Sequence, residues 1–195
     1  MGIEFELKYK VDPAAQKNVR EAFAGTEQTF SMATTYYDTP SGAFSARKCT
    51  LRRRMENEKS VCTLKAPTDG LGRREWETEC DSIEAAIGLL CKLDAPQDLL
   101  ALAEEGLLPI CGARFTRIAK TLTYGQSVLE LAMDTGVLVG ADRQIPLCEV
   151  EVELKEGSQT DCLAFAHLLE ERFGLLPEQY SKFRRALALY RGEEL

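Results

Sequence analysis

The chain has one histidine, one tryptophan and no run of apolar residues long enough to span a membrane. Its N-terminus lacks the basic-then-apolar pattern of a signal sequence, so we expect a cytoplasmic protein without a membrane partner. The seven cysteines are odd in number and form no C-x-x-C pair. They are expected to be free, mostly buried thiols, which argues against a disulfide framework or a zinc site. Catalysis by serine or cysteine through a histidine base would depend on His167 alone, and we expect that residue on a helix surface.

Basic residues are fewer than acidic residues, and the net charge is -7. A basic surface is needed to bind the phosphate backbone of a duplex, so duplex nucleic acid is not expected as a partner. Basic residues are nevertheless clustered, because five of the eight residues from Arg47 to Arg54 are Lys or Arg. The length predicts a single domain over residues 1–195, and we expect a monomer or homodimer.

Segments that alternate apolar and charged residues recur along the chain and predict β-strands. They cover residues 4–10, 30–39, 48–55, 59–66, 73–79, 114–124, 127–134 and 147–154. Helices are predicted at 12–25, 81–92, 96–105, 158–173 and 181–191, with a short turn at 44–46 and a polar loop at 135–146.

The first strand shows the pattern that organises the rest. Glu4, Glu6 and Lys8 share one face, whereas Phe5 and Leu7 lie on the other. Two carboxylates and an ammonium group in a row are what a divalent cation and a phosphate need together. When this stretch is taken alone, a solvated strand face is the better explanation.

The same alternation, with charged residues on one face of the strand, recurs in six strands; we call these positions the charged phase. Its acidic members are Glu4, Glu6, Glu75, Glu77, Asp134, Glu149, Glu151 and Glu153. Its basic members are Lys8, Arg52, Arg54, Lys65, Arg73 and Arg117, and the predicted last helix adds Lys182. Because the opposite faces are apolar, we predict an α+β fold in which a curved or closed antiparallel sheet is charged inside and covered by helices outside.

So many charges in an interior must pair with one another, bind ions, or both, because isolated buried ions are costly. Bases would take phosphate oxygens, and the spare carboxylates would take Mg²⁺ or Mn²⁺, the hard cations that oxygen ligands favour. A lattice of salt bridges on an open sheet is the alternative that needs no ligand.

The ordered set of motifs resembles the CYTH domain, or triphosphate tunnel metalloenzyme, superfamily. The matching segments are Glu4-x-Glu6-x-Lys8, Tyr36-Tyr37-Asp38-Thr39, Leu51-Arg52-x-Arg54, Thr63-Leu64-Lys65, Arg73-x-Glu75, Arg117, Leu131-Ala-Met-Asp134, Glu149-x-Glu151-x-Glu153 and Ser181-Lys182. The resemblance covers essentially the whole chain. It implies a closed or nearly closed eight-stranded antiparallel tunnel with helices packed outside.

The resemblance also implies roles for these residues. Lys8, Arg52, Arg54, Lys65, Arg73, Arg117 and Lys182 would bind phosphate oxygens. Glu4, Glu6, Asp134, Glu149 and Glu151 would hold metal or the attacking water, with Glu4, Glu6 and Lys182 as the catalytic group. Glu75, Glu77 and Glu153 are further candidates. Many members have a second basic residue where this chain has Ala119, so one phosphate contact is either absent or supplied by Lys120.

The implied activity is metal-dependent hydrolysis of a small triphosphate, with inorganic triphosphate as the leading substrate. A class IV-type adenylyl cyclase, a thiamine triphosphatase, and a non-catalytic module that binds polyphosphate or nucleotide are the alternatives. The intact acidic set favours an enzyme, because binding alone needs mainly the bases.

Overall fold

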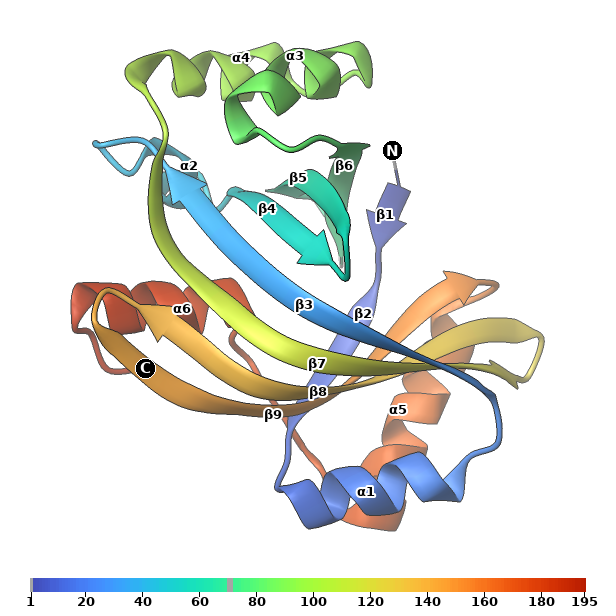
Figure 1. Ribbon diagram of the computed structural model, residues 1–195. Helices are drawn as coiled ribbons and strands as arrows, with labels where there is room; N and C mark the ends of the chain where they lie inside the picture. The colour runs from blue at the N-terminus through green and yellow to red at the C-terminus, as the bar shows by residue number, and fades with distance from the viewer. Residues whose placement is uncertain (1, 70–71) are drawn as a thin grey trace.

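The computed structural model describes residues 2–69 and 72–195, which form an α+β fold around one antiparallel sheet. The sheet has ten strands in the order β1-β6-β5-β4-β3-β7-β8-β9-β2-β10. Their bounds are β1 Gly2–Glu4, β2 Glu6–Lys10, β3 Thr26–Asp38, β4 Thr50–Glu56, β5 Lys59–Pro67, β6 Arg73–Glu79, β7 Leu108–Tyr124, β8 Ser127–Gly140, β9 Arg143–Glu156 and β10 Leu176–Pro177. The long strands β3, β7, β8 and β9 curve together across the molecule (Figure 1).

Most of the helices begin directly after a residue whose side chain caps them. They are α1 Pro13–Ala22, α2 Ala43–Ala46, α3 Ile83–Lys92, α4 Gln97–Ala101 followed by a 3₁₀ turn at Leu102–Glu105, α5 Gln159–Phe173 and α6 Lys182–Arg191. The Asp12 carboxylate accepts a hydrogen bond from the Ala15 amide at 2.7 Å, and Pro13 occupies the first turn of α1. The hydroxyl of Ser181 caps α6 in the same way through the Arg184 amide at 3.1 Å. Among the described residues, no helix is both long and apolar enough to cross a membrane.

The two ends of the sheet meet in the N-terminal strand. This strand changes partner at Phe5, so that β1 pairs with β6 and β2 pairs with β9. Counting β1 and β2 as one strand, and setting aside the two-residue β10, leaves the eight strands that were expected. The sheet is nevertheless not closed by a continuous ladder of hydrogen bonds.

Apolar residues of the strands pack against helices in separate clusters. Tyr9 and Phe165 are buried in one cluster that α1 and α5 cover, below β9 and β2 in Figure 1. Trp76 and Leu64 are buried in a second cluster that α3 and α4 cover on the opposite side. The apolar phase of these strands therefore faces outward, as predicted.

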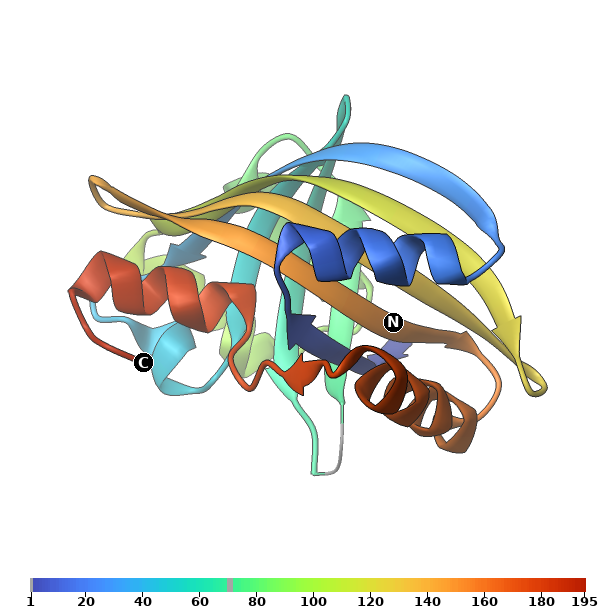
Figure 2. The same ribbon diagram turned by 90° about the horizontal axis from the view of Figure 1, so that it is seen from below.

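Helix α6 departs from the expectation that helices pack only outside. It packs on β7 and β8 at one end of the long strands, away from α1 and α5 (Figure 2). Its Ala186 and Leu187 contact a cluster containing Phe115 and Leu138, which lie on the same strand face as the charged residues. An added Cβ at Gly140 would lie 2.4 Å from a backbone nitrogen of α6, so this close approach requires glycine. Helix α6 thus covers one end of the charged face.

The predicted polar loop at 135–146 is wrong. Strands β8 and β9 continue through most of it and form a long hairpin that turns between Gly140 and Arg143. Apolar Val137, Leu138 and Val139 sustain the strand beyond Asp134, and Ala141 takes a left-handed conformation in the turn, with φ of 53°.

Candidate active site

The charged faces surround one cavity with a volume of about 380 Å³. Its lining comes from β1 to β9 and the start of α6. Every residue named above as a site candidate lines it except Asp134 and Glu149, which lie behind Lys182. The predicted phase therefore brings these side chains together in space.

Three buried carboxylates form the most compact acidic group in the described chain. Asp134, Glu149 and Glu151 each offer an oxygen within 4.8 Å of the other two. The Lys182 ammonium lies among them, with Nζ at 2.8 Å from Asp134 Oδ2, 2.6 Å from Glu149 Oε2 and 2.6 Å from Glu151 Oε1. We call these three acids the acidic cluster; only oxygen donors form it.

Two arginines complete the pairing of the acidic cluster. Arg117 donates to Asp134 through Nε at 2.8 Å and a terminal nitrogen at 2.7 Å, and it also pairs with Glu151. Arg185, one turn after Lys182 on α6, pairs with Glu149. Although burial opposes ionisation of Glu151, Lys182 and Arg117 lower its pKa, whereas burial prevails at Glu149 and raises its pKa. Each carboxylate of the acidic cluster therefore has at least two cationic contacts among Lys182, Arg117 and Arg185.

The opposite wall carries three arginines whose hydrogen-bonding capacity is only partly used. Arg52 and Arg54 project from β4 and Arg73 from β6, and the Nε–H group of each is buried without a hydrogen-bond acceptor among the described residues. Arg52 lies 3.5 Å from Glu75, while burial and the neighbouring Arg52 lower the pKa of Arg54. A buried guanidinium Nε–H without an acceptor fits an anionic ligand that supplies oxygen acceptors.

Glu4 and Glu6, two residues apart, have different surroundings. Glu4 is held by the Lys65 ammonium at 2.6 and 2.5 Å, and Lys65 lowers its pKa even though burial opposes ionisation. The nearest cation to Glu6 is Lys8, at 3.5 Å. Burial raises the pKa of Glu6, and repulsion from Glu151 and Glu4 adds to the rise. Glu6 is thus the less neutralised of the two.

The three further candidates also lie in the cavity wall. Glu75 lies 3.5 Å from both Arg52 and Lys65. Glu77 accepts from the Thr63 hydroxyl at 3.3 Å. Glu153 pairs with Lys155 at 2.9 Å, and burial raises its pKa.

Several lining residues were not predicted. Glu130 and Lys155 pair with each other at 3.6 Å, and Glu56 pairs with Arg54. Lys155 continues the two-residue step of Glu149, Glu151 and Glu153, so its phase could have indicated it. Arg185 follows Lys182 by three residues, which is the spacing of neighbours on one helix face.

An apolar wall was missed as well. It is formed by Phe30, Met32, Tyr36, Phe115 and Phe183. The Lys182 ammonium lies 5.4 Å from the centre of the Phe115 ring, and the Tyr36 and Phe183 rings are 5.0 Å apart. Phe115 shares the phase of Arg117, which was the available signal.

Lys120 does not replace a basic residue at Ala119, so that alternative is wrong. Ala119 lines the cavity, but Lys120 points to the other face of β7. Its ammonium donates to the carbonyls of Arg20 at 2.7 Å and Phe23 at 2.6 Å, at the end of α1. As expected, His167 is exposed on α5 and lies outside the cavity lining.

Comparison with known proteins agrees with this architecture. An inorganic triphosphatase of Haemophilus influenzae is 28% identical over 193 residues, which is 95% of this chain and 54% of that protein. The chain therefore spans about half the length of this curated relative.

Solved structures share the fold at low sequence identity. HpAC1 from Hippeastrum, a candidate adenylyl cyclase with a dominant triphosphatase activity, matches with a TM-score of 0.66 and 21% identity over 100% of this chain and 98% of that one. The PH1819 protein of Pyrococcus horikoshii matches with a TM-score of 0.65 and 20% identity over 95% and 99% of the two chains. The CYTH domain matches residues 2–187, and the chain belongs to the CYTH domain family.

Proposed function

We propose that this protein is a divalent-metal-dependent hydrolase of small triphosphates and that inorganic triphosphate is its substrate. The observation that supports it best is the division of the cavity. One wall carries the buried Nε–H groups of Arg52, Arg54 and Arg73 without an acceptor, and the other borders the acidic cluster, whose carboxylates already have cationic partners. A polyanion would satisfy the first wall without disturbing the second. The inorganic triphosphatase relative supports the choice of substrate.

The sheet would act as a tunnel around the substrate. The meeting of its two ends at Phe5 supports this shape, because Glu4 on β1 and Glu6 on β2 both line the cavity. Lys65 and Lys8, which lie beside these acids, would extend the basic wall toward the phosphate chain.

In the proposed reaction the bases bind and orient the substrate. Arg52, Arg54, Arg73 and Lys65 neutralise the non-bridging oxygens, which gain charge in the transition state. A water attacks the terminal phosphorus, the bond to the bridging oxygen breaks, and diphosphate leaves. Glu6 accepts the proton of the water, since its ion pair with Lys8, at 3.5 Å, is longer than that of Glu4 with Lys65.

The carboxylates suit a hard cation such as Mg²⁺ or Mn²⁺. The acidic cluster offers three oxygen donors within 4.8 Å, and Glu4 and Glu6 add two more in the same cavity. A bound divalent ion supplies charge neutralisation and activates water for attack at neutral pH. Lys182 would bind a phosphate oxygen, and Glu4 would hold Lys65 in place.

Phosphate release from inorganic triphosphate, ATP and thiamine triphosphate, each with Mg²⁺ or Mn²⁺, tests the proposal. We expect the highest kcat/KM with inorganic triphosphate. Cyclic AMP as the main product from ATP would contradict a hydrolase, and binding of all three without turnover would leave a binding module.

Metal removal is expected to abolish hydrolysis. Without a divalent cation the carboxylates of the cavity repel a triphosphate, so dialysis against EDTA should reduce phosphate release to background. Added Mg²⁺ or Mn²⁺ should restore it. An unchanged rate in EDTA would refute the metal requirement.

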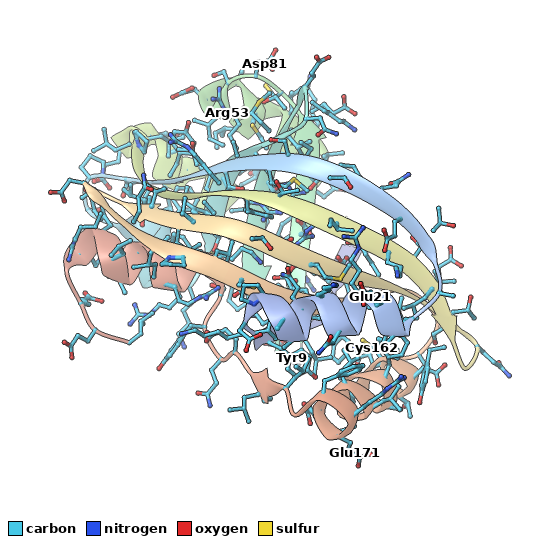
Figure 3. All side chains as sticks on the ribbon, turned by 60° about the horizontal axis from the view of Figure 1, so that its bottom comes forward. Tyr9, Glu21, Arg53, Asp81, Cys162 and Glu171 are labelled. Carbon is cyan, nitrogen blue, oxygen red and sulfur yellow. The ribbon has the colours of Figure 1, made fainter. Side chains whose placement is uncertain are left out.

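Replacing one of the bases proposed to bind the triphosphate should weaken substrate binding. Arg52→Ala and Lys65→Ala each remove a charge-assisted contact worth about 1.5–3 kcal/mol, or roughly a 10- to 150-fold rise in KM. Arg53→Ala is the matched control. Arg53 lies next to Arg52 but faces outward, where it donates to the Asp81 carbonyl at 2.6 Å (Figure 3). An unchanged KM in both variants would contradict the proposal that Arg52 and Lys65 bind the substrate.

A further inference from the structure

The acidic cluster already contains a cation, and that cation belongs to the protein. Lys182 Nζ lies 2.6–2.8 Å from one oxygen of each of Asp134, Glu149 and Glu151. The Lys182 side chain is 10% exposed and the Asp134 and Glu149 side chains are fully buried. A metal ion that used the same three oxygens would have to take the position of this ammonium.

Repulsion between cations makes shared occupancy unfavourable. Arg117, Lys182 and Arg185 already pair with the three carboxylates, and Arg117 and Arg185 also pair with Glu130 and Glu178 further out. A divalent ion added without removing Lys182 would lie within a few ångströms of its ammonium group. Coulomb repulsion at that separation is strong in a buried site.

Lys182 is better placed than the two arginines to leave the acidic cluster. Lys182 is the first residue of α6, and it lines the cavity as well as contacting the cluster. Arg117 is fixed by two bonds to Asp134, and Arg185 lies outside the cavity lining. A lysine side chain is flexible and can carry its charge several ångströms, toward the side of the cavity that carries Arg52, Arg54 and Arg73.

We infer that Lys182 and the divalent cation compete for the acidic cluster. The metal enters the cluster only when the Lys182 ammonium leaves it for the cavity, where a triphosphate oxygen would be its next partner. The inference rests on the proposed function for the identity of the ligands. It assigns Lys182 two positions, one in the metal-free protein and one in the loaded protein.

Mn²⁺ binding to the metal-free full chain, measured from the EPR signal of free Mn²⁺, tests the competition without any substrate. Lys182→Met removes the charge and keeps the length of the side chain. We expect it to lower the dissociation constant for Mn²⁺ by at least about tenfold. Lys155→Met is the matched control, because Lys155 lines the same cavity but pairs with Glu130 and Glu153. It should change the constant by less than about threefold.

A second measurement uses the unmodified protein and does not depend on a variant that folds. Acetic anhydride labels free lysine amines, and peptide mass spectrometry reports each site. Mn²⁺ should increase acetylation of Lys182 and leave that of Lys155 unchanged. Acetylation of Lys182 that does not rise with bound Mn²⁺ would overturn the inference.

The outcomes separate this inference from the proposed function. If Mn²⁺ binds equally to the parent and to Lys182→Met, the competition is refuted, but a metal-dependent hydrolase remains. If no Mn²⁺ binds to any variant, both fail. If Lys182→Met binds Mn²⁺ more tightly and the parent releases no phosphate from any triphosphate, the competition holds and the hydrolase is refuted.

Discussion

Arg117→Met should lower the free energy of unfolding by about 3–5 kcal/mol in metal-free protein. Arg117 makes two hydrogen bonds to Asp134 and one to Glu151, and Asp134 is fully buried. Methionine fills most of the space but leaves a buried carboxylate without its main partner. For a chain of this size the change corresponds to a fall in Tm of roughly 6–20 °C, which thermal unfolding in EDTA will measure.

Arg20→Met is the control for this loss. Arg20 also donates two hydrogen bonds to a carboxylate, that of Glu27, at 3.2 and 2.8 Å, but the Arg20 side chain is 42% exposed. An exposed pair is worth at most about 1 kcal/mol. If both variants lose the same small amount of stability, the acidic cluster is not held by buried ion pairs.

The strand faces could be predicted because the side-chain period of a strand is two. One charged residue assigns the face of every second neighbour, so Glu4, Arg52 and Glu151 were placed in one interior without knowledge of the fold. The outward position of Trp76 followed from the same period, and Trp76 is buried under α3.

The pairing within that interior could not be predicted. Alternation gives the face of a residue but not its neighbours on other strands, which depend on register and twist. Lys65 meets Glu4 across 61 residues of sequence, and Arg185 meets Glu149 across 36. The buried Nε–H groups of Arg52 and Arg54 that lack an acceptor became visible only from the arrangement of the side chains around the cavity.

The position of α6 had a signal that was overlooked. Leu138 and Leu147 are apolar but share the phase of Asp134 and Glu149. Apolar residues in the charged phase require a partner on the interior face, and α6 provides it. The helix thereby brings Lys182 to the acidic cluster, which no helix packed outside the sheet could do.

Glu6→Gln is expected to reduce kcat by about 10²–10⁴-fold, the range of general acid–base catalysis. Gln is nearly isosteric with Glu but cannot accept a proton from the attacking water. Triphosphate binding should be retained or tightened, because the substitution removes a negative charge from the cavity. A fall in kcat with an unchanged or lower KM is the pattern of a residue that acts on the transition state.

Stability separates this role from a structural one. Burial and repulsion raise the folded-state pKa of Glu6, so its ionisation costs stability as pH rises through that pKa. Glu6→Gln should therefore raise Tm slightly at pH 8, and the gain should vanish at a pH below the pKa of the unfolded chain.

Glu4→Gln should do the opposite. The folded-state pKa of Glu4 is lowered by Lys65, so its charge contributes stability above the pKa of the unfolded chain and loses that contribution as pH falls. Replacing it should lower Tm at pH 8 because Lys65 loses its closest partner. Both Tm and kcat are to be measured on the same preparations of the two variants.

A Glu6→Gln protein that is destabilised yet fully active would show that Glu6 only balances Lys8, and the proton acceptor would have to be another group.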